Sequence, residues 1–280
     1  MKALVINRSN NFGDCMCQMT AIKEWKERNP GFEVDFITCF YLHWIAANHT
    51  DNFERIIFES DPNKMNLPGY DQTIEFKVDW GNAVNYGILR SWCETTLHFI
   101  PSTDKPYFLL TEEEKLTALH HYRAIMYNDY ASETQNSPRY RKSVIFQPEA
   151  VSDPRRSFRG EDWARLIDLF PNDVAIIYFC PLERKFEKPI TDKPNLIMLP
   201  GYPIGTSAAM MQLTDSIFTV HSATAMLAHA VDAKNIIHIN FLEMSGKGIL
   251  NVQNGEDVFF ESNLNFNWDV IKEKIDKYLL

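Results

Sequence analysis

The chain has 280 residues, a formal net charge of −9 and a 45% share of hydrophobic residues. That apolar share is typical of a globular protein and excludes a wholly disordered, collagen-like or coiled-coil chain. The length predicts two domains or one large α/β unit. The acidic balance argues against a protein that coats nucleic acid without sequence preference, because phosphate binding needs clustered lysine and arginine.

Short apolar runs alternate with helical patterns along the first part of the chain. We expect strands at 3–7, 34–39, 55–58 and 73–76, and helices at 16–28, 42–48 and 82–99. The sequence Asn29-Pro30-Gly31 ends the first of these helices, because proline and glycine interrupt a helical pattern. Thr111, followed by three glutamates, predicts the start of a further helix.

The polar segment 130–138 has no apolar period and is interpreted as an interdomain linker. Beyond it we expect strands at 143–147, 174–179, 196–199, 217–220 and 236–240, and helices at 161–169, 207–213, 223–231 and 268–280. Strands separated by helices indicate βαβ crossovers and parallel sheets. Because the pattern occurs twice, we predict an α/β protein with two Rossmann-like domains facing across a cleft, residues 1–136 and 137–280.

The chain shows no sign of a secretory signal or a membrane span. Its first strand follows no basic segment, and no stretch approaches about 18 uninterrupted apolar residues. The five cysteines are odd in number and scattered, which favours free thiols in a reducing compartment. Cys15 and Cys17 lack the spacing of a zinc motif. We therefore expect a cytoplasmic protein without a bound metal.

The loop after the first strand carries small polar residues where ligands bind in open α/β sheets. Ser9, Asn10, Asn11 and Gly13 would let a ligand approach the backbone closely, and they are the predicted acceptor-binding residues. Asp14 would place a carboxylate at the start of the next helix, although an aspartate there also serves simply as a helix cap. The glycine patterns of dinucleotide-binding and P-loop sites are absent.

A second polar stretch follows the strand at 143–147. Ser152, Arg155 and Arg156 lie in its loop, and the planar guanidinium group of arginine suits a diphosphate. Residues 137–159 contain six basic side chains and two acidic ones. This local excess indicates an anion site, and the alternative is a solvated loop with surface ion pairs.

A third stretch begins where the strand at 217–220 ends. His221 follows the strand, and Ser222, Ala223 and Thr224 open a helix of small residues. Free backbone N–H groups at such a helix start can hold a phosphate. The alternative is close packing of the helix on the sheet, with Ser222 as an ordinary N-cap.

These three stretches, in this order, resemble the ADP-heptose:lipopolysaccharide heptosyltransferases, a glycosyltransferase family with the two-domain GT-B arrangement. The resemblance rests on Gly13-Asp14 after the first strand, on Arg156 seven positions before Trp163, and on a motif spanning 214–230. Phe158 matches an aromatic position, and Ser152 matches a phosphate-binding hydroxyl.

The third motif departs from the family pattern. His221 replaces an aspartate that helps hold the donor in relatives, Ala223 replaces a glycine, and Met226 replaces a histidine. Ser222 and Leu227 follow the pattern. The departures leave the identity of the donor open.

The resemblance implies a glycosyltransferase that moves a sugar from a nucleotide diphosphate sugar to an acceptor hydroxyl. It implies inversion at the anomeric carbon, no metal and no cofactor, with Asp14 as the general base. Residues 1–136 would bind the acceptor, a glycan or another hydroxyl compound, and residues 137–280 would bind the donor. The predicted donor-binding residues are Ser152, Arg155, Arg156, His221, Ser222, Ala223 and Thr224.

Two other functions stay open on the sequence. A glycosyltransferase acting on a modified base of duplex DNA would use the basic segment 137–159 to follow the DNA backbone. A non-catalytic nucleotide-sugar binding protein would account for the altered third motif.

Overall fold

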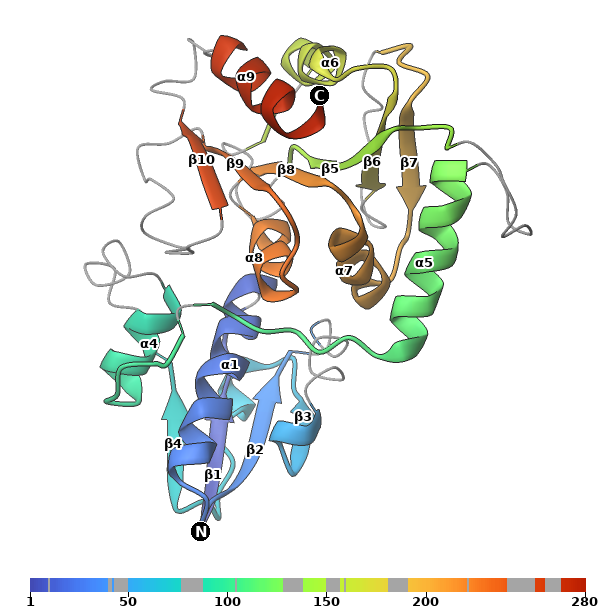
Figure 1. Ribbon diagram of the computed structural model, residues 1–280. Helices are drawn as coiled ribbons and strands as arrows, with labels where there is room; N and C mark the ends of the chain where they lie inside the picture. The colour runs from blue at the N-terminus through green and yellow to red at the C-terminus, as the bar shows by residue number, and fades with distance from the viewer. Residues whose placement is uncertain are drawn as a thin grey trace. The chain divides into compact units, whose positions relative to one another are not determined.

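The computed structural model describes residues 1–9, 11–39, 42, 50–76, 88–103, 105–127, 138–149, 157–158, 160–180, 191–220, 222–240, 255–259 and 268–280. The described residues fold into two compact units, one up to Leu109 and one from Leu110 onward. Each unit contains a parallel sheet (Figure 1). The predicted α/β class with parallel sheets is therefore confirmed. Of the predicted elements, the helix at 42–48 lies outside the described residues apart from Leu42, as does the segment 130–137.

The first unit is a four-stranded sheet with strand order β3-β2-β1-β4. Its strands are β1 (Lys2–Ile6), β2 (Glu33–Thr38), β3 (Arg55–Phe58) and β4 (Gln72–Glu75), and its helices are α1 (Phe12–Arg28), α4 (Ile88–Thr96) and the short 3₁₀ helices η2 (Thr50–Asn52) and η3 (Pro62–Lys64). Helix α4 is shorter than the predicted 82–99, of which 82–87 lie outside the described residues. It ends before His98, whose φ of 60° is left-handed and incompatible with a helix.

Both faces of the central strand β1 are covered. Its residues 3–6 are all buried, as expected of a strand in a parallel sheet. Leu4 and Ile6 pack with Ile37 and with Met65 from the segment that follows β3. Helices α1 and α4 pack against each other in the same unit. This segment around Met65 therefore covers a sheet face on which α/β folds usually place a helix.

Helix α1 begins at Phe12, before the predicted start at residue 16, and much of its first half is buried. Residues 15–22 are all buried, so this part of the helix has no solvent face. The two polar side chains in it are Gln18 and Thr20, and Thr20 donates a hydrogen bond to the Met16 carbonyl (2.8 Å) while accepting one from the Tyr107 N–H (3.1 Å). An internal partner thus replaces water for the hydroxyl of Thr20.

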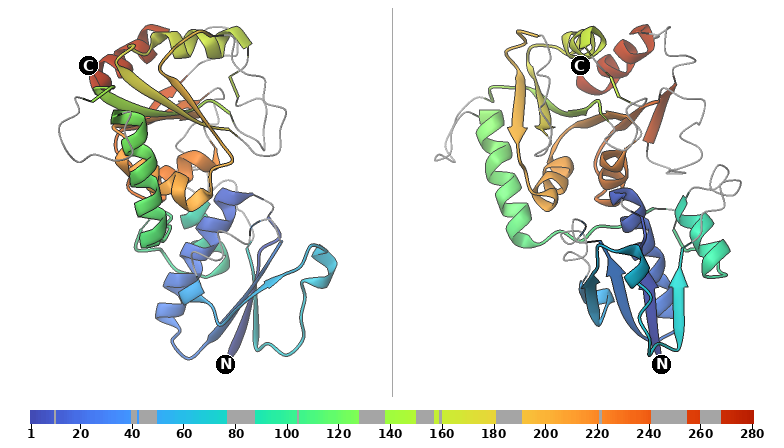
Figure 2. Two further views of the ribbon diagram at one scale, coloured as in Figure 1. Left: turned by 90° about the vertical axis from the view of Figure 1, so that its right-hand side faces the viewer. Right: turned by 180° about the vertical axis from the view of Figure 1, so that it is seen from behind.

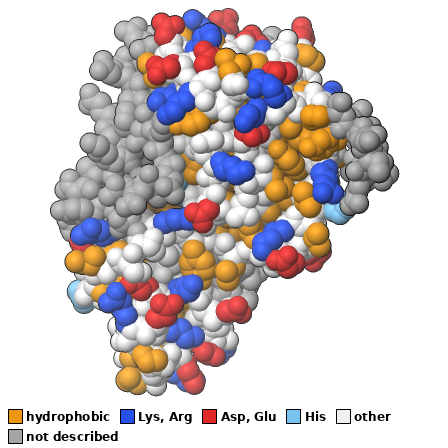
Figure 3. Space-filling model, viewed as in Figure 1, with side chains coloured by type: hydrophobic (Ala, Val, Ile, Leu, Met, Phe, Trp, Pro, Cys, Tyr) orange, Lys and Arg blue, Asp and Glu red, His pale blue; other side chains and the backbone are white. Residues whose placement is uncertain are grey.

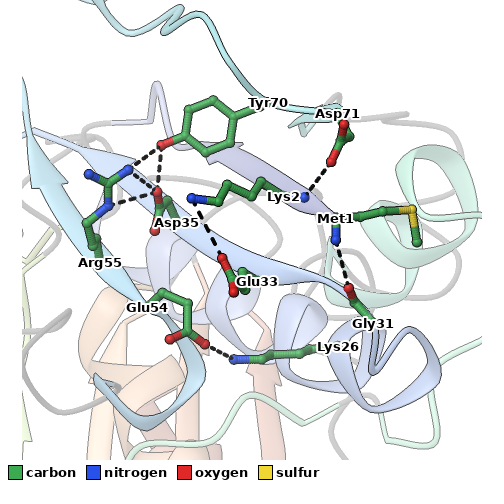
Figure 4. A network of polar contacts seen from close by, with 10 residues as sticks. All are labelled: Met1, Lys2, Lys26, Gly31, Glu33, Asp35, Glu54, Arg55, Tyr70 and Asp71. Atoms are coloured by element: carbon green, nitrogen blue, oxygen red, sulfur yellow. Dashed lines mark hydrogen bonds and ion pairs between the residues drawn. The ribbon is translucent and has the colours of Figure 1, made fainter.

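A polar network ties the strands of the first unit together (Figure 4). Asp35 of β2 is buried and accepts hydrogen bonds from Arg55 of β3 (2.6 Å and 3.0 Å) and from the Tyr70 hydroxyl (2.6 Å). Burial alone would raise the pKa of Asp35, but these hydrogen bonds outweigh it and lower the pKa. The carboxylate of Asp35 is therefore a charged anchor between β2, β3 and the residues before β4.

The second unit is a six-stranded sheet with strand order β10-β9-β8-β5-β6-β7. Its strands are β5 (Lys142–Gln147), β6 (Val174–Cys180), β7 (Leu196–Pro200), β8 (Ser216–Val220), β9 (Ile236–Asn240) and β10 (Gly255–Phe259), and its helices are α5 (Glu112–Tyr127), α6 (Gly160–Leu169), α7 (Ile204–Leu213), α8 (Ala223–Ala230) and α9 (Trp268–Leu279). The sequence analysis missed β10. Its sequence Gly-Glu-Asp-Val-Phe contains no apolar run, so only pairing with β9 makes it a strand.

Helices cover both faces of this sheet (Figures 1 and 2). Residues of α6 and α9 share a core with Val144, Phe146 and Tyr178 of the sheet. Helices α5, α7 and α8 lie on the opposite face, where α5 packs against α7 and α7 against α8. The arrangement is a three-layer α/β fold.

The division between the units differs from the predicted boundary at residues 136 and 137. Helix α5 belongs to the second unit, because it packs against α7 and because Met126 joins a core cluster with Tyr140 and Ala175. The hydroxyl groups of Tyr122 and Ser143 lie 3.0 Å apart, which links α5 to the start of β5. Composition identified the polar segment 130–138 but could not show which sheet α5 covers.

Asp215, from the motif that carries the family resemblance, lies at the amino end of β8. Its Oδ2 accepts hydrogen bonds from the Ser143 N–H (2.9 Å) and the Ser143 hydroxyl (3.1 Å). These bonds fix the start of β5 beside the start of β8. The role of this carboxylate among the described residues is structural, at the edge of the sheet remote from the ligand-binding end.

Candidate functional site

The strand order of each sheet defines one position where a ligand is expected. In the first unit the chain passes from β1 to β2 and β3 on one side, and β4 then adds on the other side of β1. In the second unit it passes from β5 to β6 and β7, and then to β8 and β9 on the other side of β5. Ligands of open α/β sheets bind at the carboxyl ends of the strands where this order reverses. These points lie between β1 and β4 and between β5 and β8.

The loop after β1 lies at the reversal point of the first sheet and is held by the buried Asn7. The Asn7 amide donates to the Thr38 hydroxyl (2.9 Å), and its carbonyl oxygen accepts the Ser9 N–H (2.9 Å). The Asn7 N–H also bonds to the Ile37 carbonyl (2.9 Å). The loop is therefore fixed to the end of β2 before it reaches α1.

Asp14 is the third residue of α1, and its side chain is half-buried. Its Oδ2 accepts hydrogen bonds from the Ser9 hydroxyl (2.6 Å) and the Asn11 amide (3.3 Å). Both bonds fall on one oxygen, and no described residue donates to Oδ1. The N-cap of α1 is Asn11, so the alternative in which Asp14 caps the helix is wrong. An oriented carboxylate with one oxygen available is suited to accept a proton.

The other predicted acceptor-binding residues surround Asp14. Ser9 is half-buried, Asn11 is exposed, and Gly13 is buried in the first turn of α1. The described glycines with positive φ are Gly69 and Gly201, so Gly13 does not need a left-handed backbone. Asn10 lies outside the described residues. The structure thus brings Ser9, Asn11 and Asp14 together, with the Ser9 hydroxyl already bonded to the carboxylate.

Sequence analysis missed Arg8 in the same loop. Its guanidinium donates to Glu75 at the end of β4 (2.8 Å), to the Pro62 carbonyl and to Asn66 (3.4 Å). Arg8 therefore joins the two strands on either side of the reversal point. Its partner Glu75 lies 67 positions later in the sequence, so no local pattern indicates the contact.

The cysteines next to Asp14 are unsuited to act as nucleophiles. Cys15 and Cys17 are buried, and burial together with the nearby Asp14 charge raises the pKa of each thiol. Both remain protonated at neutral pH. Among the described residues, no group of three or more His, Cys, Asp or Glu side chains is placed to hold a metal ion.

The reversal point of the second sheet carries the start of α8. Ser222 is the N-cap, with φ −152° and ψ 177°, and its side chain makes no capping hydrogen bond. Its hydroxyl lies 3.5 Å from that of Thr219. Ala223 and Thr224 are half-buried in the first turn. Because Ser222 does not satisfy the first N–H groups of α8, they can bond to an anion. His221 lies outside the described residues.

Only some of the predicted site residues in and after the loop that follows β5 are described. Ser152, Arg155 and Arg156 lie outside the described residues, so their placement stays a prediction. Phe158 and Trp163 are buried in the core of the second unit, where the Trp163 and Tyr178 rings lie 5.3 Å apart. These two aromatics therefore support the fold around the loop.

The described basic side chains of the segment 137–159 are Arg139, Arg141 and Lys142, and they lie at the amino end of β5. Arg141 pairs with Asp173 (2.8 Å), and Lys142 pairs with Asp215 (3.4 Å). The pairing of Arg141 lowers the pKa of Asp173. Two of the six basic side chains in this segment are thus paired with aspartates, at the end of the sheet opposite the carboxyl ends of its strands.

A polar group at the ends of β5 and β6 was also missed. Tyr178 of β6 donates a hydrogen bond from its hydroxyl to Glu149 (3.1 Å), and Gln147 of β5 bonds to the same hydroxyl. Burial and the Glu149 charge raise the pKa of Tyr178, so its proton stays in place. Of the three residues, Gln147 pairs in register with Thr219 of β8.

The fold is shared with solved structures of glycosyltransferases. Comparison of the sequence with models of protein families and with curated proteins finds no match. Among solved structures, the chain is similar to Escherichia coli ADP-heptose LPS heptosyltransferase II, with a TM-score of 0.72, 13% identity and coverage of 99% of this chain and 98% of the other.

Two further solved structures are similar to this chain. A family 9 glycosyltransferase from Veillonella parvula has a TM-score of 0.64 at 12% identity, over 92% of this chain and 85% of the other. The E. coli heptosyltransferase WaaC with ADP has a TM-score of 0.55 at 13% identity, over 99% and 97%. The α/β class with parallel sheets, expected from the sequence, is thus shared with these glycosyltransferase structures. No described helix is long and apolar enough to cross a membrane.

Proposed function

We propose that this chain is a glycosyltransferase that moves a sugar from a nucleotide diphosphate sugar to an acceptor hydroxyl. The observation that carries the proposal is the position of Asp14 and of the α8 start, each at the reversal point of its own sheet. The similarity to heptosyltransferases over nearly the whole chain supports it. Solved structures of related heptosyltransferases contain ADP and an ADP-heptose, which supports a nucleotide-sugar donor.

In the proposed reaction, Asp14 Oδ1 takes the proton of the acceptor hydroxyl. The acceptor oxygen forms a bond to the anomeric carbon from the side opposite the diphosphate, and the bond from that carbon to the diphosphate oxygen breaks. Inversion follows from this direction of attack. The negative charge that develops on the leaving diphosphate is stabilised by the first N–H groups of α8 and by Arg155 and Arg156. No metal is needed for this charge stabilisation.

The test measures binding and transfer separately. Calorimetric titration with the diphosphates of adenosine, uridine, guanosine and cytidine identifies the nucleotide, and the corresponding nucleotide sugars are then assayed for turnover. Asp14→Asn is expected to bind the nucleotide normally and to lose about 10²- to 10⁴-fold in kcat. The exposed Asp51→Asn is the matched control and is expected to keep full activity.

The outcomes separate the candidate functions. Nucleotide binding without turnover in the wild type would favour the non-catalytic binding protein. Equal kcat values for Asp14→Asn and the wild type would remove Asp14 from the mechanism. If none of the four nucleotides binds, the proposal fails.

A further inference from the structure

The ends of the three central strands of the second sheet carry polar side chains that the proposed reaction does not use. Gln147 is the last residue of β5 and pairs in register with Thr219 of β8. Tyr178 is near the end of β6, the strand on the other side of β5, and Glu149 follows β5 directly. These residues lie at the sheet edge where a ligand is expected.

The hydrogen bonds of this group determine which way the Gln147 amide points. The Tyr178 hydroxyl has one proton, and it donates that proton to Glu149 Oε2 (3.1 Å). Among the influences on the pKa of Tyr178, the Gln147 side chain acts to lower it, as an NH₂ group that faces the hydroxyl oxygen does. The carbonyl oxygen of Gln147 therefore points elsewhere.

That carbonyl oxygen has no donor among the described residues. Gln147 is 7% exposed, and its Oε1 is buried without a hydrogen-bond partner. A buried acceptor that lacks a donor destabilises a fold, so such atoms in native proteins call for an explanation. A ligand that brings an O–H or N–H group to this atom supplies the missing bond.

The charge of the group indicates which part of a donor it can bind. Glu149 Oε1 and Gln147 Oε1 are both acceptors, and a carboxylate repels phosphate. The first N–H groups of α8, on the β8 side of Gln147, attract phosphate instead. The diphosphate and a hydroxyl-bearing part of the same donor therefore have separate places along this edge.

We propose that Gln147 and Glu149 form a diol-binding pair that accepts hydrogen bonds from neighbouring hydroxyl groups of the donor. Tyr178 is a positioning residue, because its hydroxyl orients both side chains. The inference rests on the proposed function, since it assigns these residues to a nucleotide diphosphate sugar. The diol belongs either to the ribose or to the transferred sugar, and both present the same chemistry.

The test compares ligands with and without the hydroxyl groups. The probes are the four nucleoside diphosphates, their 2′,3′-dideoxy forms and their glucose conjugates, titrated by calorimetry. Gln147→Met keeps the side-chain length and removes the acceptor, and we expect it to weaken binding of the preferred glucose conjugate about tenfold. Glu149→Gln is also expected to weaken binding of the preferred glucose conjugate.

Comparison of the three kinds of probe identifies which part of the donor supplies the diol. If the ribose is bound, the wild type prefers the ribonucleoside diphosphate over its dideoxy form about tenfold, and Gln147→Met removes this preference. If the sugar is bound, the loss is confined to the glucose conjugates. Tyr178→Phe should reduce the same discrimination, which a purely structural role would leave unchanged. Glu161→Gln, at an exposed position in the first turn of α6, is the control.

Two results are decisive against the inference. If Gln147→Met raises the thermal stability and leaves every affinity unchanged, the amide is a packing defect and the diol-binding pair does not exist. If the wild type binds none of the probes, the proposed function fails as well, and that failure is visible without any variant.

Discussion

The Ser9 hydroxyl connects two parts of the candidate catalytic loop. It donates to Asp14 Oδ2 (2.6 Å) and accepts the Asn11 N–H (3.1 Å). The sequence analysis assigned Ser9 to the acceptor, whereas its hydroxyl is bonded to the carboxylate. Ser9 thus holds Asp14 in one orientation, which a general base requires, because a proton is transferred only along a well-aligned hydrogen bond.

We expect Ser9→Ala to lower kcat about tenfold with little change in donor affinity, since it removes alignment and leaves the carboxylate in place. The measurement is kcat with the nucleotide sugar identified by titration. Ser9→Thr keeps the hydroxyl and should restore most of the rate. A Ser9→Ala enzyme with wild-type kcat would show that Asp14 needs no support from this side chain.

Asp35 allows a test of stability against pH in the first unit (Figure 4). Its pKa in the folded chain is lower than in the unfolded chain, where it is about 3.9. The Arg55–Asp35–Tyr70 contacts therefore stabilise the fold fully above about pH 4, and this contribution is lost as the pH falls through the folded pKa.

Arg55→Met is expected to reduce the free energy of unfolding at pH 7 and to reduce it by less at pH 3, where Asp35 is partly protonated. Urea unfolding at the two pH values measures the difference. Lys26→Met is the control, because its partner Glu54 (3.3 Å) is exposed and the pair should contribute under about 1 kcal/mol at either pH. A pH-independent effect of Arg55→Met would mean that the ion pair is not the source of the stabilisation.

Local sequence was sufficient for some of these residues and not for others. Asp14 was predicted as a site residue because a glycine, a carboxylate and a helix start follow the first strand. Gln147, Tyr178 and Asp35 were not, because their partners come from neighbouring strands. Tyr178 lies 29 positions from Glu149, and Tyr70 lies 35 positions from Asp35. Only the strand order brings such pairs together.

At the scale of elements, α5 shows how a correctly predicted helix can be assigned to the wrong unit. Its start was predicted at Thr111, and the capping box confirms it: the Thr111 hydroxyl accepts the Glu114 N–H (3.2 Å), and Glu114 accepts the Thr111 N–H (2.7 Å). The capping pattern is local and visible in the sequence. The packing of α5 against α7 is not local.

Glu114 also contacts α7. A Cβ atom added to Gly205, in the first turn of α7, would lie 1.7 Å from Glu114 Oε1. The glycine is thus needed for close approach. A carboxylate near the start of a helix is favourable, because the helix dipole is positive there. Glu114 therefore stabilises the starts of two helices at once.

Gly205→Ala is expected to destabilise the chain by about 1 kcal/mol, because the new methyl group displaces Glu114 from both helix starts. In the Glu114→Ala background the same change should stabilise by about 0.5 kcal/mol, since alanine favours a helix. Urea unfolding of the four proteins gives the coupling energy. A coupling energy near zero would show that Glu114 moves aside without cost.

At the scale of the whole molecule, alternation of strands and helices predicted the fold class well. Two features could not be predicted from this alternation. The boundary between the units depends on which sheet α5 covers, and β10 depends on pairing with β9. The distribution of charge was also misleading, because two basic side chains of the segment 137–159, Arg141 and Lys142, are paired with aspartates at the amino end of β5.

The paired charges bear on the alternative function, in which DNA is the acceptor. The chain carries a net charge of −9. Arg141 and Lys142 are paired with aspartates, and on the face shown in Figure 3 the Lys and Arg side chains are interspersed with Asp and Glu. A protein that follows a DNA backbone instead presents a continuous cationic surface, since each phosphate contact releases a counterion.

We therefore expect no saturable binding to a duplex of about 20 base pairs at 0.15 M salt, because the net negative charge of the chain repels the DNA backbone. Fluorescence anisotropy with up to micromolar protein measures this binding. An Arg155→Ala, Arg156→Ala double variant is the matched test. It should lose nucleotide diphosphate affinity and show no change toward DNA. Tight binding to the duplex that weakens steeply with salt and disappears in the double variant would instead place DNA in the role of acceptor.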